Sequence, residues 1–179
     1  NWSLNAIPAT THHVVIDINA NITFPASATI DSFEVSNSAV VTLTSSGVTK
    51  KLTIGAGGGV IESGASLTLK GNASGRMDFG FSGTNVPFLV QGSFTITDVG
   101  SGCTYTATSG ITTITGTFKN DGTSGGTVAT IASPSSSNFI FGAGGTYEHA
   151  LAGGTIPASS WNATSTCKIV GSVGAHPSG

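Results

Sequence analysis

The sequence predicts an all-β fold, namely a right-handed parallel β-helix, or β-solenoid, with irregular coil lengths. Short runs of β-branched and aromatic residues alternate with polar residues at period two, whereas helical periodicity is almost absent. The turns suit hairpins poorly, because the chain has no Asn-Gly and its Asp121-Gly122 lies in a longer Gly/Ser-rich loop. Similar strands return one coil later, which favours a solenoid over a sandwich or a barrel.

The predicted strands are short alternating segments, each followed by Gly, Asn or Ser. No linker long enough to divide the chain separates them, so we expect residues 1–179 to form a single domain. In chain order the strands are Val15–Ile18, Ile22–Phe24, Ile30–Val35, Val40–Leu43, Lys51–Ile54, Val60–Ile61, Ser66–Leu69, Met77–Phe81, Phe88–Val90, Ser93–Thr97, Thr112–Ile114, Thr117–Lys119, Phe139–Phe141, Thr146–Tyr147 and Cys167–Val170.

Recurring apolar pairs indicate how the coils stack. Early in the chain, shifts of 17 and then 19 relate the pairs Ile16/Ile18, Phe33/Val35 and Leu52/Ile54. Later, residues 88–94 resemble residues 112–118 after a shift of 24. We therefore expect the shift from coil to coil to vary between 17 and 29, with the additional length in Ser/Gly-rich insertions such as 120–126 and 133–138.

Three glycines each precede an aromatic residue by two positions, in the pairs Gly92/Phe94, Gly116/Phe118 and Gly145/Tyr147. A corner between flat strands requires backbone angles that Gly tolerates best, so we expect these glycines at equivalent corners. The aromatic side chains then point inward and stack between coils, where each buried one contributes about 1.5 to 3 kcal/mol. Alternation places hydroxyl side chains such as Thr95 outward.

The composition indicates a protein that works outside the cell. Only 8% of the residues are charged, against about a quarter in an ordinary soluble domain, and Gly, Ser and Thr take the polar positions. Six Lys and Arg residues cannot neutralise a phosphate track, which argues against nucleic acid as a partner. The net charge of −2 favours neither membrane surfaces nor polyacids, and the positive mean hydropathy argues against disorder.

The chain has no secretory signal and no apolar run near 18 residues, so we expect no membrane insertion. It opens at Asn1 without a Met, which predicts a processed product or a segment of a longer surface protein. Cys103 and Cys167 are able to pair in an oxidising compartment, and their spacing fits two buried free thiols equally well. Neither has a partner at metal-ligand spacing, so we expect no metal site and no cofactor.

The most distinctive stretch contains Tyr147-Glu148-His149, then Gly154-Thr155-Ile156-Pro157, Trp161, and Cys167-Lys168-Ile169-Val170-Gly171. It resembles a motif of large exported surface proteins of Bacteroidetes bacteria: Tyr and His, Gly-Thr-Ile-Pro, a Trp, Ser-Thr and a closing Ile-x-Gly. Some of those proteins are adhesins related to gliding motility, and they contain right-handed β-helix regions. The resemblance implies an extracellular β-helical segment, and it carries over no catalytic residue.

The candidate binding residues are Tyr147, Glu148, His149 and Trp161. Glu148 and His149 follow an aromatic residue and precede a glycine-rich turn, but no Ser or Cys near them has a nucleophile signature. A structural hydrogen-bonding role is therefore favoured for His149. Trp161 and Trp2 suit either a platform for stacking sugars or caps over the solenoid ends, and capping is favoured.

Other reactive residues are expected to be structural. The acids are dispersed, and even Asp17, expected to stack on Glu34, does not predict the carboxylate pair of a glycoside hydrolase. His12 and His13 diverge on an extended chain, so an exposed turn is favoured over a metal chelate. The Gly-Gly-x-Gly-x-Asp rows of calcium-binding β-rolls are missing. Ice binding through outward Thr rows requires more regular coils than these.

The sequence thus predicts a structural or adhesive extracellular module, not an enzyme. We expect a stiff stalk or a filament-forming surface protein that associates with itself or with other surface-protein chains. The alternative is a carbohydrate-binding module that contacts surface glycans through aromatic and hydroxyl side chains of one lateral sheet. A polysaccharide lyase or hydrolase is the third hypothesis.

Overall fold

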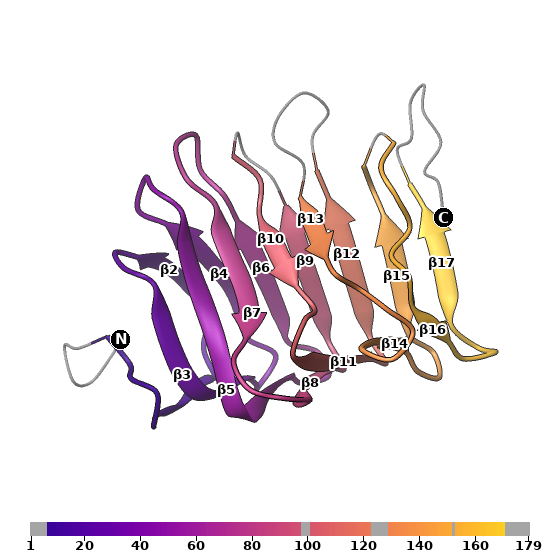
Figure 1. The fold of residues 1–179 in the computed structure, drawn as a ribbon, viewed down its shortest axis with the longest axis horizontal. Helices are drawn as coiled ribbons and strands as arrows, with labels where there is room; N and C mark the ends of the chain where they lie inside the picture. Colours follow the sequence, from indigo (N-terminus) through magenta and orange to yellow (C-terminus); the bar gives the residue numbers. More distant parts are fainter. Residues whose placement is uncertain (1–6, 98–100, 123–128, 152, 171–179) are drawn as a thin grey trace.

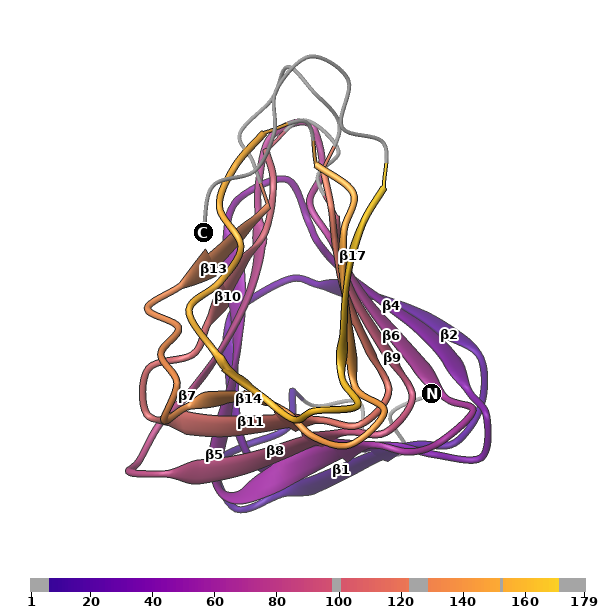
Figure 2. The same ribbon diagram turned by 90° about the vertical axis from the view of Figure 1, so that its right-hand side faces the viewer.

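The computed structural model describes residues 7–97, 101–122, 129–151 and 153–170, and these residues form strands and no helix. The chain winds into a solenoid with a roughly triangular cross-section (Figures 1 and 2). Seen from the C-terminal end, it runs anticlockwise while it advances towards the viewer, which is a right-handed coil (Figure 2). Neighbouring coils pair their strands in parallel in two sheets. The predicted fold class is confirmed.

One side of the triangle, side 1, is a sheet of seven parallel strands. Its register runs without a bulge through every pairing of the described strands. In order along the solenoid axis the strands are β2 (Ala20–Phe24), β4 (Val40–Ser45), β6 (Ser66–Lys70), β9 (Ser93–Thr97), β12 (Thr117–Asp121), β15 (Thr146–His149) and β17 (Thr166–Ile169).

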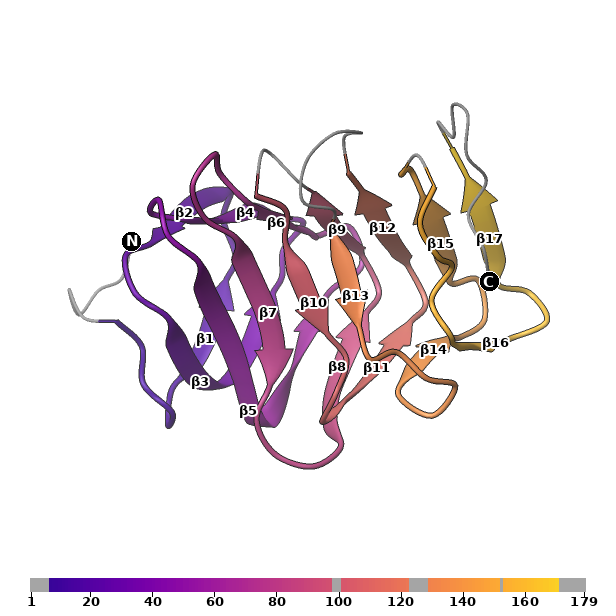
Figure 3. The same ribbon diagram turned by 45° about the horizontal axis from the view of Figure 1, so that its top comes forward.

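The other two sides share a ten-stranded sheet that bends at a corner. β3 (Ala28–Val35) and β5 (Lys50–Ile61) run around this corner, so that residues 50–54 of β5 pair on side 2 and residues 59–61 pair on side 3. Side 2 continues along the axis with β7 (Met77–Phe81), β10 (Thr104–Thr106) and β13 (Thr130–Ala132), as Figure 3 shows. The further strands of side 3 are β1 (His13–Ile16), β8 (Val86–Val90), β11 (Gly110–Ile114), β14 (Phe139–Phe141) and β16 (Ser160–Trp161).

The structure confirms one predicted repeat and corrects another. Thr112 pairs with Phe88 and Phe118 pairs with Phe94, both at the predicted shift of 24. The early shifts of 17 and 19 were wrong, because the observed partners are Val14/Phe33, Ile16/Val35, Phe33/Gly59, Val35/Ile61, Ala28/Leu52 and Ile30/Ile54. Alternation recurs every two residues, so it does not distinguish registers that differ by two. It also gave no sign that β5 continues past Gly57 around a corner.

Most predicted strands are present, with ends shifted by up to two residues, but three short strands were missed. β10, β13 and β16 are two or three residues long and are built largely from Thr, Ser and Ala. Their order comes from parallel pairing with neighbouring coils rather than from their own pattern. The predicted closing strand Cys167–Val170 lies one residue earlier, at Thr166–Ile169.

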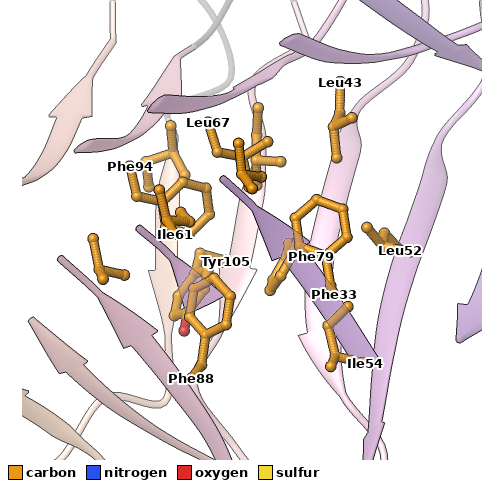
Figure 4. Close-up of a cluster of buried hydrophobic side chains, with 14 of the residues drawn as sticks. Phe33, Leu43, Leu52, Ile54, Ile61, Leu67, Phe79, Phe88, Phe94 and Tyr105 are labelled. Carbon is orange, nitrogen blue, oxygen red and sulfur yellow. The ribbon is translucent and has the colours of Figure 1, made fainter. Parts of the chain in front are cut away.

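The core is a continuous column of aromatic and aliphatic side chains inside the triangle. Phe94, Phe118 and Tyr147 are fully buried, as predicted, and Thr95 is only half-buried on the outer face. Phe79 stacks on Tyr105 with ring centroids 5.8 Å apart, and edge-to-face pairs continue the column towards both ends. Figure 4 shows part of this core, to which sides 1, 2 and 3 all contribute. Each aromatic pair contributes about 0.5 to 1.5 kcal/mol beyond its area burial.

Gly92, Gly116 and Gly145 do occupy equivalent corners, but the predicted reason was wrong. None of the three has a positive φ. Instead, a Cβ on each would collide with a backbone carbonyl of the preceding coil, for example those of Gly92 and Gln91 above Gly116. These corners require glycine because neighbouring backbones approach too closely for any side chain.

Candidate functional site

The Tyr147-Glu148-His149 stretch lies on β15 of side 1, and its strand geometry splits the predicted cluster. Side chains alternate across a strand, so Tyr147 and His149 point into the core and Glu148 points to solvent. Tyr147 and His149 are completely buried, whereas Glu148 is partly exposed. The structure therefore does not bring Glu148 and His149 together as a catalytic pair.

Tyr147 and His149 form a buried hydrogen-bonded chain. The Nε2 atom of His149 lies 2.6 Å from the carbonyl oxygen of Gly153, and its Nδ1 atom lies 3.1 Å from the Tyr147 hydroxyl. A carbonyl only accepts, so Nε2 carries the proton, and in this tautomer Nδ1 accepts from the Tyr147 hydroxyl. Burial raises the pKa of Tyr147, and a hydrogen bond with Asn120 lowers it less, so the hydroxyl remains a donor. This arrangement closes the Gly153 turn over the core.

Asn120 is a second polar residue inside the solenoid, directly beside His149 in the register of side 1. Its Nδ2 atom donates to the carbonyl of Ala129 at 3.3 Å, while its Oδ1 atom is buried without a partner among the described residues. The column that holds Asn120 and His149 is apolar in the earlier coils, where Leu43, Leu69 and Ile96 occupy it. Asn120 and His149 mark the C-terminal part of the core as different from the rest.

Glu148 belongs to a ladder of charges on the outer face of side 1. Its carboxylate lies 3.4 Å from Nζ of Lys119 and 3.1 Å from Nζ of Lys168, and Lys119 also pairs with Asp121 at 3.1 Å. Partial burial acts to raise the pKa of Glu148, but hydrogen bonds from Lys168 and Lys119 outweigh it and hold that pKa below its usual value. The hydrogen bond to Asp121 is the main reason that the pKa of Lys119 is raised. Glu148 is therefore an ionised structural partner at neutral pH and a poor general acid.

Trp161 lies on β16, at the C-terminal end of side 3. Its ring stacks on Phe141 with centroids 4.2 Å apart and planes 10° apart, and it is 38% exposed. It continues the inward column that runs through Ile114 and Phe141, so one face of the ring packs on the core, and the choice between a cap and a sugar-stacking platform stays a prediction. Trp2, the other predicted cap, lies outside the described residues.

The two cysteines are free in the structure and do not form a disulfide. Cys103 is buried just before β10, whereas Cys167 is exposed on β17 beside Tyr147. Burial raises the pKa of the Cys103 thiol to about 11 and also raises that of Cys167. Among the described residues, no three His, Cys, Asp or Glu side chains gather as metal ligands do.

The predicted stacking of Asp17 on Glu34 was wrong. Glu34 pairs in register with Val15, and its carboxylate lies 3.7 Å from Nε2 of His13. The reason is the same shift of two residues that affected the early repeats. His12 lies in the expected exposed turn, where its Nδ1 atom accepts a hydrogen bond from the backbone N–H of Ala9.

Side 1 also carries a surface feature that sequence reasoning underestimated. Its outer face presents columns of hydroxyls in unbroken register, because the variation in coil length falls between the strands of this sheet and not within them. Neighbouring rows are therefore about 4.8 Å apart. Alternating Thr and Ser in the predicted strands was the available signal. The columns contain Thr42, Thr44, Ser66, Thr68, Ser93, Thr95, Thr97, Thr117, Thr146 and Thr166.

No protein-family model, curated protein or solved structure matches the chain. In the part of the chain that the structure describes, no helix has the length and apolar character needed to cross a bilayer.

Proposed function

We propose that this chain is a structural module of an extracellular or cell-surface protein, a stiff β-solenoid stalk that holds other parts at a distance. The supporting observation is the continuity of its interior. Parallel sheets run from coil to coil along the described length, and aromatic contacts link the core from Phe33 to Trp161, so each coil buries its neighbour. Continuous packing of this kind resists bending and keeps a fixed length.

The surface supports an extracellular location. Its polar positions are mainly hydroxyls, and few side chains carry charge. The stretch from Tyr147 to Gly171 adds a resemblance to exported surface proteins of Bacteroidetes, so we propose a bacterial surface protein of that adhesin or gliding-related type as its setting. Other surface-protein chains and further copies of this chain are the partners that such a module would contact.

A glycan panel combined with a shape measurement tests the stalk proposal. The purified chain is applied to immobilised polysaccharides of varied linkage and charge, and its shape is followed by small-angle X-ray scattering. A stalk gives a rod-like scattering profile and no saturable binding. A tight glycan interaction at micromolar chain concentration contradicts a purely structural role.

The second candidate function is carbohydrate binding, and the hydroxyl columns of side 1 favour it. Flat rows of Thr and Ser at regular spacing offer many donors and acceptors to an extended sugar chain. In this case Thr68→Arg and Thr95→Arg abolish binding, whereas Thr113→Arg on side 3 leaves it unchanged. If Trp161→Ala abolishes binding instead, the sugar binds at the C-terminal end, where the indole ring offers a stacking surface.

A polysaccharide lyase or hydrolase is the third candidate and has the least support. Its best acid, Glu148, is held between two lysines and has a lowered pKa, which suits an ion pair better than proton donation. Turnover that disappears in Glu148→Gln but survives in Glu62→Gln is the result that favours an enzyme.

A further inference from the structure

Large hydrophobic side chains that are exposed lie only towards the two ends of the described solenoid. They fall within residues 7–48 and residues 161–170, and the described coils between these ranges have none. Val15 and Val40 point outward from sides 3 and 1, whereas the exposed apolar residues of the last described coil lie at the end of the rod, where exposed apolar surface indicates a contact. The exposed large hydrophobic residues are Ile7, Val15, Ile18, Val40, Val48, Trp161, Ile169 and Val170.

The last described coil has exposed side chains at inward positions. Cys167 and Ile169 occupy the inward columns of side 1, where their strand neighbours Tyr147 and His149 are fully buried. Cys167 and Ile169 are nevertheless exposed, Ile169 by 54%. Within the described residues, β17 pairs only with β15 and β16 pairs only with β14, so each strand has one edge without a described partner. Free edges with apolar neighbours are templates for pairing with another chain.

The N-terminal end of the described solenoid presents the other pair of strand edges. β1 and β2 are the first strands of their sides, and each has a described partner on one edge only. A small apolar hollow of about 10 Å³ lies here, and its lining includes Pro8, Ile22 and the nearly buried Val14, Ile16 and Phe24. Trp161 and Ile169 of a second copy have the chemistry to cover this apolar end.

We propose that the C-terminal end of one chain stacks on the N-terminal end of a second copy, so that β17 pairs with the next β2 and β16 with the next β1. This inference rests on the proposed structural role and names its partner. The internal registers fix the alignment, because Trp161 falls in the column that begins at Ile16. Ile169 likewise falls in the column that begins at Ile22.

The corner between sides 3 and 1 also fits this junction. Trp161 precedes Cys167 by six residues, whereas Ile16 precedes Ala20 by four. The chain already stacks a six-residue corner directly against a four-residue corner, where Ile61 to Leu67 lies beside Val90 to Phe94.

Charges do not oppose the junction. In the aligned register Lys168 lies beside Asn21, Thr166 beside Asn19 and Ser160 beside Val15, so no like charges meet at these positions. The two faces are different surfaces, which makes the contact heterologous. Repeated stacking without closure then yields a linear filament one solenoid wide.

The test blocks one end at a time, at exposed positions where folding is not threatened. Ile169→Arg blocks the C-terminal end, Ile18→Arg blocks the N-terminal end, and Thr113→Arg on side 3, away from both ends, is the matched control. Sedimentation velocity is measured over a concentration series under reducing conditions, so that Cys167 cannot cross-link chains. The wild-type chain and Thr113→Arg are expected to form oligomers that grow with concentration, and each end variant is expected to associate at least roughly tenfold more weakly.

Mixing the variants gives the decisive result. An equimolar mixture of Ile169→Arg and Ile18→Arg is expected to form a dimer and grow no further, because one intact C-terminal end meets one intact N-terminal end. Dimers of Ile18→Arg alone mean symmetric pairing of C-terminal ends and overturn the proposal. A wild-type chain that remains monomeric at all concentrations also overturns it, and it leaves the stalk proposal standing if the monomer is rod-shaped and binds no glycan.

Discussion

Tyr147 and His149 are the residues whose burial is hardest to reconcile with an apolar core unless they bond to each other. Replacing Tyr147 with Phe keeps the ring and leaves Nδ1 of His149 buried without a donor. We expect Tyr147→Phe to lower the free energy of unfolding by about 1 to 3 kcal/mol, the cost of an unsatisfied buried group. Urea denaturation measures this loss.

The double variant Tyr147→Phe, His149→Leu provides the control for this pair. Because the second substitution removes the unsatisfied nitrogen, the double variant is expected to lose less than the sum of the two single losses. Strict additivity would contradict a direct bond between the two side chains.

The two thiols should differ sharply in reactivity. Cys167 is exposed, whereas Cys103 is buried and its pKa is raised to about 11, so little thiolate forms at neutral pH. We expect one cysteine to react with an alkylating reagent in the native protein and the second only in denaturant, as followed by mass spectrometry. Cys167→Ser should remove the fast reaction, and two unreactive cysteines would indicate that a disulfide forms after all.

At the residue scale, part of the candidate site could be predicted from the sequence. Alignment of Gly145-Thr146-Tyr147 with Gly116-Thr117-Phe118 was enough to place Tyr147 inside, and alternation then puts His149 inside and Glu148 outside. The bond from His149 to Gly153 was not predictable, because it depends on how the chain turns after β15. Predicting the ion pairs of Glu148 would have required the strand registers to both neighbouring coils. These registers place Lys119 on one side of Glu148 and Lys168 on the other.

Among the structural elements, the corners between sides 3 and 1 are the most constrained. We expect Gly116→Ala to destabilise the solenoid by about 1 to 3 kcal/mol, because the added methyl collides with backbone carbonyls that cannot move aside. Gly142→Ala is the matched control, since a Cβ there approaches mainly the Thr115 methyl group, at 3.1 Å. Thermal denaturation of the two variants makes the comparison, and equal melting temperatures would show that backbone proximity is not the constraint.

The charge ladder formed by Lys119, Asp121, Glu148 and Lys168 should make the free energy of unfolding depend on pH. The pKa of Glu148 is lowered in the folded state, so its contribution is present above the ordinary glutamate pKa of about 4.3 and is lost as pH falls through the lowered value. Exposed ion pairs are worth little, so we expect Glu148→Gln to cost about 0.5 to 1 kcal/mol at pH 7.

At a pH below both the ordinary and the lowered folded-state pKa of Glu148, the wild-type protein and Glu148→Gln should be equally stable. Denaturant titrations across the acid range measure the difference, and about 1 M salt at pH 7 should shrink it by screening. A difference that persists in acid and in salt would assign the loss to packing of the Glu148 side chain rather than to its charge.

The prediction of strands succeeded where apolar residues alternate over four or more positions, as in Met77–Phe81 and Ser93–Thr97. It failed at β10, β13 and β16, which are too short to show alternation, so parallel pairing with a neighbouring coil decides their conformation. It also divided β5 in two, because its Gly-rich middle resembles a loop although it is a bend within one strand. Local sequence patterns thus predict the longer strands, whereas the registers between strands and the positions of the corners depend on contacts between coils.

Across the whole molecule, each coil contacts mainly its neighbours, so a complete coil should be removable. Deleting residues 91–114 joins Val90 to Thr115, and the shift of 24 between coils at β8/β11 and at β9/β12 keeps every following side chain on its face. We expect this variant to fold cooperatively with lower stability and a shorter rod in small-angle scattering.

Deleting residues 91–113 is the matched control. It removes one residue fewer, so every following side chain is displaced by one position and the inward set turns outward. This variant should be unfolded or aggregated by circular dichroism. If both deletions behave alike, the register of the coils does not govern the fold.

The stacking of Trp161 on Phe141 also equips the molecule with an optical reporter of its last coil. The chain has two tryptophans, so in a Trp2→Phe background the indole fluorescence arises from residue 161 alone. Far-UV circular dichroism averages over every strand, whereas this emission follows the ring contact at one end. Separation of the two signals in denaturant would reveal fraying from the C-terminal coil inward, and coincident signals would show that the coils melt as one unit.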